Sequence, residues 1–166
     1  NDSYANKANV SLRFEVGKTI NFSCELNNGS SLMNASVKVY YNGTSKLRNE
    51  STNSSFEFLI PSGFWDLNLN TSSLNVSLFK VNLTQNESRS IRINDDVNLS
   101  QISESVKAIK TVALKFLNFS FEEANLFFTF NSSLVSNASN LEVYECSDWN
   151  FSNSSCETSW INDSSS

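Results

Sequence analysis

Apolar and polar residues alternate over much of the first half of the chain, and the pattern is clearest in residues 9–16. The four apolar residues of this segment are Val10, Leu12, Phe14 and Val16. Successive side chains of a β-strand point to opposite faces. The segment is therefore predicted to be the first strand, with one face buried.

The same two-residue period predicts six further strands before residue 94. Turn-forming sequences such as Asn42-Gly43 and Pro61-Ser62-Gly63 separate some of them. In the longest strand the inward phase passes from Leu78 to Phe79, which indicates a β-bulge. The predicted strands are 19–26, 35–41, 56–60, 64–69, 74–84 and 90–93. Short strands spaced by turns are typical of a β-sandwich.

A domain boundary is predicted at Asn94-Asp95-Asp96. The apolar residues that follow fit helical and strand spacing almost equally well. We favour a short helical turn near 100–105, followed by strands at 107–121, 124–130 and 141–146. The expected fold is all-β, with two Ig-like or transthyretin-like β-sandwich modules at 1–94 and 95–166. The second module is one strand short, and an open sheet edge of that kind needs a partner strand.

Nineteen Asn-x-Ser/Thr sequons include most of the 25 asparagines. An Asn- and Ser-rich composition alone produces several, but it does not explain their placement. In seven sequons the middle residue is large and apolar, namely Val10, Phe22, Val76, Leu83, Leu99, Phe119 and Phe151. On a strand this spacing sends the glycan outward and the apolar group inward.

Because N-glycans are added only to exported chains, the sequons predict an extracellular or cell-surface protein coated with covalent N-linked glycans. The predicted glycosylation sites are Asn1, Asn9, Asn21, Asn28, Asn34, Asn42, Asn49, Asn53, Asn70, Asn75, Asn82, Asn86, Asn98, Asn118, Asn131, Asn137, Asn150, Asn153 and Asn162.

Charge and hydropathy exclude several classes of partner. The net charge is -5 and the twelve Lys and Arg are scattered, so a nucleic acid is not expected to bind. The chain contains no apolar run long enough to span a membrane. It begins on Asn-Asp-Ser without a visible signal peptide, and we interpret it as a processed or truncated piece of a longer precursor.

The residues offer little for catalysis. The absence of histidine excludes Ser/His/Asp catalytic triads, Cys/His catalytic dyads and the common zinc sites. The carboxylate pairs Asp95-Asp96 and Glu122-Glu123 are adjacent in sequence, so on a strand their side chains diverge and do not suit a glycosidase. Asn94-Asp95-Asp96 lacks the spacing of a calcium loop. We expect no enzyme activity, metal or cofactor.

Three cysteines leave one without an intramolecular partner. Cys146 and Cys156 close a short loop flanked by Trp149 and Trp160, and a disulfide is predicted between them. Cys24 has the phase of the inward residues around it and is predicted to be a buried thiol.

Three stretches of the sequence resemble two kinds of known module. Val37-Lys-Val-Tyr-Tyr-Asn-Gly and Phe56-Glu-Phe-Leu-Ile-Pro-Ser-Gly-Phe-Trp-Asp-Leu resemble carboxypeptidase-regulatory-like or transthyretin-like sandwiches of surface proteins. Asn140-Leu-Glu-Val-Tyr-Glu-Cys-Ser-Asp-Trp-Asn-Phe-Ser-Asn-Ser-Ser-Cys-Glu-Thr-Ser-Trp resembles the Cys/Trp-bearing segment of archaeal secreted and S-layer-type proteins, including the PGF-pre-PGF group. The resemblance implies a β-rich surface glycoprotein and no catalytic residues.

The leading hypothesis is a structural glycoprotein subunit of an archaeal extracellular filament or surface layer. Residues 9–16 would complete a sheet of the next identical subunit, so that the contact propagates into a polymer. The alternative is a cell-surface adhesin or carbohydrate-binding module that contacts host or neighbouring cells through exposed aromatics such as Trp65 or Trp149. A eukaryotic or viral glycoprotein with a glycan shield has a similar composition.

Overall fold

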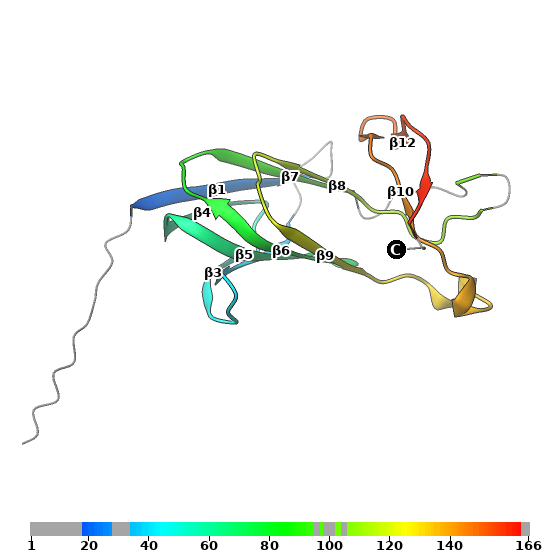
Figure 1. Ribbon diagram of the computed structural model, residues 1–166, viewed down its shortest axis with the longest axis horizontal. Helices are drawn as coiled ribbons and strands as arrows, with labels where there is room; N and C mark the ends of the chain where they lie inside the picture. The colour runs from blue at the N-terminus through cyan, green and yellow to red at the C-terminus, as the bar shows by residue number, and fades with distance from the viewer. Residues whose placement is uncertain (1–17, 28–33, 95–96, 98–101, 104–105, 164–166) are drawn as a thin grey trace, which may run out of the picture.

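The computed structural model describes residues 18–27, 34–94, 97, 102–103 and 106–163. Their main body is a β-sandwich, a four-stranded sheet packed on a five-stranded one (Figure 1). The all-β prediction is confirmed. Within these ranges the only helical elements are two 3-10 turns, η1 (Ser132–Leu134) and η2 (Ala138–Asn140). No helix in the described part of the chain has the length and hydropathy that a bilayer crossing requires.

The four-stranded sheet combines segments that are far apart in the sequence. In spatial order its strands are β4 (Ser55–Pro61), β1 (Thr19–Asn27), β7 (Ser88–Asn94) and β8 (Ala113–Leu117). β1 is antiparallel to β4 but parallel to β7, and β8 is antiparallel to β7. The central parallel pair joins the first described strand to the seventh.

The five-stranded sheet is antiparallel throughout. In spatial order its strands are β3 (Leu47–Ser51), β2 (Ser36–Tyr41), β5 (Gly63–Asn70), β6 (Leu74–Leu83) and β9 (Glu123–Phe128). β3 was not among the predicted strands, because Leu-Arg-Asn-Glu-Ser has one apolar residue and no alternation. It is an edge strand paired only with β2, and a polar edge strand is a common safeguard against unwanted pairing.

The core lies between the sheets and follows the predicted alternation. In β1 the side chains of Ile20, Phe22, Cys24 and Leu26 are at most 3% exposed, while the residues between them face outward. Phe22 is at the centre of an aromatic cluster. Its ring centroid lies 5.6 Å from that of Phe56 and 6.4 Å from those of Phe58 and Phe119.

The predicted change of phase in β6 is present, with one difference. Leu78 and Val81 are buried, so the inward face skips both Phe79 and Lys80, and Phe79 is only half-buried. Lys80 has a positive φ of 52°. The buried carboxylate of Asp66 accepts hydrogen bonds from the backbone N–H groups of Lys80 (3.0 Å) and Gly43 (2.7 Å) and holds the bulge against the neighbouring turn.

The sandwich continues past the boundary predicted at residue 94. β8 pairs with β7 in one sheet and β9 pairs with β6 in the other, so both belong to the sandwich that begins at β1. The reason is packing, because Val112, Leu114 and Phe116 lie against the core formed by β1, β2 and β4 to β7. No second sandwich begins at residue 95 in the part that the structure describes.

Residues 129–163 form a small segment with two short antiparallel ribbons. One pairs β10 (Tyr144–Glu145) with β13 (Ile161–Asn162), and the other pairs β11 (Trp149–Asn150) with β12 (Ser155–Cys156). The strand predicted at 141–146 is thus reduced to two residues. The strand predicted at 9–16 and most of the turn predicted at 100–105 lie outside the described residues.

Candidate functional site

Both sheets end on the same side of the sandwich, at β8 and β9, which are consecutive in the chain (Figure 1). In the strand pairing of the described residues, neither strand has a second neighbour. The backbone groups on their outer sides are therefore left for another strand to pair with.

The inward residues of these two strands are incompletely covered. Leu126 and Phe128 of β9 are paired in register with Val76 and Leu74 of β6, and cross-strand partners share a face. The two β6 residues are at most 2% exposed, whereas Leu126 is 46% and Phe128 44% exposed. Leu114 and Phe116 of β8, in register with the buried Ile93 and Ile91, are only partly buried.

We call this set, Leu114, Phe116, Leu126 and Phe128, the open edge. The connection between β8 and β9 covers part of it, because Phe121 and Phe119 lie 5.4 Å and 5.9 Å from the Phe116 ring. Among the described strands, none pairs along the rest of this inner surface. An added strand with alternating apolar side chains would bury it.

The asparagines of the described sequons are all at least partly exposed, although the side-chain oxygens of Asn21 and Asn82 are buried. Four of the nineteen asparagines, Asn1, Asn9, Asn28 and Asn98, lie outside the described residues. Each of the other fifteen is exposed or half-exposed. The middle residues Phe22, Val76 and Leu83 are fully buried, and Phe119 packs against the core. Phe151 is half-buried, and Val10 and Leu99 are not described.

Glycans are expected at Asn9, which lies outside the described residues, and at the partly or fully exposed Asn21, Asn75, Asn82 and Asn118. Attachment there leaves the core intact because the apolar residue of each described sequon points inward. Peptide mass mapping before and after deglycosylation checks each site. Unmodified peptides at most of these five positions would contradict the prediction.

The predicted disulfide is present. Cys146 and Cys156 are bonded, with their Cα atoms 6.0 Å apart. The ring of Trp149, within the loop, lies 6.1 Å from that of Trp160, just after it. Cys24 is free and 3% exposed. Burial raises the pKa of its thiol to about 12, while the nearby charge of Arg89 acts in the opposite direction. The thiol is therefore neutral and inert near neutral pH.

Cys24 is expected to resist iodoacetamide in the folded protein at about pH 8 and to react after unfolding. Its folded pKa lies above the unfolded value, so its contribution to stability is complete below about pH 9 and falls as the pH rises toward 12. Urea denaturation across this pH range should show that the free energy of unfolding falls more steeply for the wild type than for Cys24→Ala. Equal labelling rates in folded and unfolded protein would refute the assignment.

The aromatic platform proposed for the alternative function does not form as expected. Trp65 is 3% exposed, and its indole N–H donates to the carbonyl of Pro61 at 3.0 Å, so it belongs to the core. Trp149 is half-buried against Trp160. These two residues lie on different parts of the chain and do not make one exposed surface.

The acidic pairs also behave as surface charges where they can be placed. Glu122 forms an ion pair with Lys80 at 2.5 Å, and Glu123 is exposed at the start of β9. Asp95 and Asp96 lie outside the described residues. Within the described ranges, no three His, Cys, Asp or Glu residues gather as a metal site would require.

Sequence reasoning missed Arg89. Its position alternates in phase with Ile91 and Ile93, so the pattern placed a charged residue on the inward face of β7. The residue is 4% exposed, and its guanidinium lies 5.5 Å above the Phe22 ring. The sequence signal that could have identified Arg89 is a charged residue at a position where the alternation of β7 predicts a buried side chain.

Comparison of the chain with family models, with curated proteins and with solved structures gives no match. The function therefore has to be inferred from geometry.

Proposed function

We propose that this chain is a structural glycoprotein subunit that assembles with copies of itself outside the cell by β-strand addition, forming a filament or surface layer. The observation that supports this most directly is the open edge, where inward side chains of β8 and β9 remain partly exposed. A strand from another subunit that pairs along this edge would bury these side chains and stabilise the sandwich.

The donor we infer is the segment of residues 9–16, which lies outside the described residues. Its apolar residues Val10, Leu12, Phe14 and Val16 recur at every second position, which is the spacing that a pleated strand presents to one face. A donor at one end and an acceptor edge elsewhere make a heterologous contact. Such a contact propagates into a polymer.

The distribution of sequons favours an edge as the interface. Sequon asparagines are exposed or half-exposed on both sheets and in the connections, so attached glycans keep much of the surface wet. Backbone pairing along a strand needs no large apolar face. The resemblance to archaeal surface-layer modules stays a prediction, because no family model matches the chain.

Blocking the open edge tests the proposal. Leu126→Lys combined with Phe128→Lys places two charges on the inner side of β9, and we expect no polymers by electron microscopy. Both residues are about half-exposed, so lysine can extend to solvent and the subunit should stay folded. Thermal unfolding checks this.

The matched control is Phe127→Lys, on the opposite face of the same strand and 66% exposed. It should polymerise normally. Polymers of wild-type appearance from the double variant would show that the joint lies elsewhere.

A further inference from the structure

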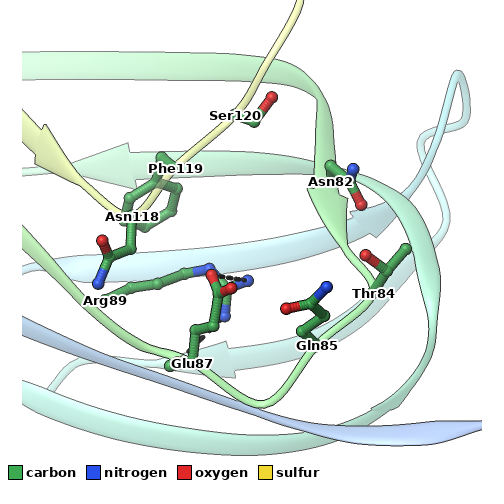
Figure 2. A pocket seen from close by; sticks show the side chains of 8 residues that line it. All are labelled: Asn82, Thr84, Gln85, Glu87, Arg89, Asn118, Phe119 and Ser120. Carbon is green, nitrogen blue, oxygen red and sulfur yellow. Dashed lines mark hydrogen bonds and ion pairs between the residues drawn. The ribbon is translucent and has the colours of Figure 1, made fainter.

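A pocket of about 320 Å³ lies where the connection from β6 to β7 meets the connection from β8 to β9. The backbone N–H of Asn82 donates to the carbonyl of Ser120 at 2.8 Å and ties the two segments together. Figure 2 shows the eight lining residues, which are Asn82, Thr84, Gln85, Glu87, Arg89, Asn118, Phe119 and Ser120.

Arg89 is the most deeply buried polar group of this pocket, with a side chain only 2% exposed. It donates to the carbonyl of Glu87 at 3.1 Å and forms an ion pair with the Glu87 carboxylate at 3.6 Å. In Figure 2 the guanidinium lies beside Glu87, among the other lining side chains. Burial lowers the pKa of Arg89, and Glu87 opposes this shift. The hydrogen bond and the ion pair to Glu87 hold the guanidinium in place.

The chemistry of the lining favours a neutral, hydroxyl-rich ligand. Arg89 and Glu87 carry the only formal charges of the pocket, and these cancel. The five other polar residues bear amides or hydroxyls, which can donate as well as accept hydrogen bonds. A phosphate site would instead gather donors and net positive charge. Phe119 adds an aromatic wall, and the volume is at the lower end of the range for ligand pockets, roughly 300–1,000 Å³.

Six of the eight lining residues belong to three sequons, which are 82–84, 86–88 and 118–120. Asn86 is exposed, and its side-chain oxygen accepts a hydrogen bond from the backbone N–H of Asn21 at 2.8 Å. Sugar chains attached to these asparagines would begin at or beside the pocket. A saccharide is therefore the hydroxyl-rich ligand that would lie closest to this pocket.

We propose that this pocket is a saccharide-binding site that takes a neutral sugar ring of an N-linked glycan, with Arg89 as the principal hydrogen-bond donor and Phe119 as the apolar wall. The glycan belongs either to the sequons around the pocket or to another molecule. The site is separate from the open edge, and its test does not depend on polymer formation.

The test uses the full chain produced without glycans, with its disulfide verified. Saturation-transfer NMR and titration are carried out with N-acetylglucosamine, mannose and glucose 6-phosphate. We expect a neutral sugar to bind the wild-type chain. Arg89→Met keeps an unbranched side chain over Phe22, and we expect it to weaken this binding about ten-fold or more. Arg92→Gln, on the other face of β7, is the matched control and should bind normally.

Gln85→Ala is a second variant, because Gln85 is exposed in a connection and its loss should not unfold the sandwich. We expect binding to weaken about two- to ten-fold. The native glycoprotein distinguishes the two sources. If free sugar binds only the chain without glycans, the protein's own glycan fills the pocket, and if it binds both forms, the ligand comes from another molecule.

Three results would overturn the proposal. They are the absence of neutral-sugar binding to the chain without glycans, wild-type binding by folded Arg89→Met, and binding of glucose 6-phosphate more than ten-fold tighter than the neutral sugars. Near-UV circular dichroism establishes that each variant is folded.

Discussion

Removal of residues 1–16 is expected to abolish polymer formation while leaving a soluble, folded subunit. Each fully buried apolar side chain contributes about 1.5–3 kcal/mol to the stability of a contact. The four apolar side chains of the donor segment together therefore determine whether the contact between subunits is stable. The described core consists of residues between Ile20 and Ala124. The measurement is electron microscopy with sedimentation of the truncated and the complete chain.

A matched pair of full-length variants tests whether assembly requires the apolar side chains of residues 9–16 or only the presence of the segment. Replacing Val10, Leu12, Phe14 and Val16 with serine should prevent assembly as the truncation does. Replacing the polar residues Ser11, Arg13 and Glu15 with alanine should not. Normal polymers from the truncated chain would place the donor strand elsewhere or exclude strand addition.

Phe22→Ala is expected to lower the free energy of unfolding by about 3–5 kcal/mol, the range for deleting a fully buried aromatic side chain. Phe22 is 0% exposed, and its ring contacts those of Phe56, Phe58 and Phe119. It also supports the guanidinium of Arg89. The substitution therefore leaves a cavity and removes the surface beneath a buried charge.

Urea denaturation of the chain without glycans measures this effect, and the sequon at Asn21 stays intact in the variant. Phe64→Ala is the control, because Phe64 is 56% exposed and its loss should change stability by no more than about 0.5 kcal/mol. A loss below about 1 kcal/mol for Phe22→Ala would mean that the core is not packed around this ring.

The elements predicted correctly are those with a local two-residue period. β1, β2, β4, β5, β6 and β7 all match predicted strands to within two residues at each end. The burial of Cys24 and of the middle sequon residues follows from the same period, because a strand in a sandwich has one buried and one wet face. The short spacing between Cys146 and Cys156 predicted their disulfide in a similar way.

The elements that were missed or displaced depend on partners that are distant in the chain. β3 has no apolar alternation and becomes a strand through pairing with β2. The predicted boundary at residue 94 came from a local polar cluster, yet β8 and β9 extend the same two sheets. Local composition does not show which sheet a later strand joins.

The same distinction between local patterns and long-range contacts applies to the candidate sites. The sequence placed the sequons and the donor pattern of residues 9–16, because each is a local arrangement of residue types. The tertiary structure alone brought Leu126 and Phe128 to an uncovered edge and gathered three separate sequons around Arg89. The order of strands in the two sheets sets these contacts, and that order depends on which long-range pairings bury the most apolar surface.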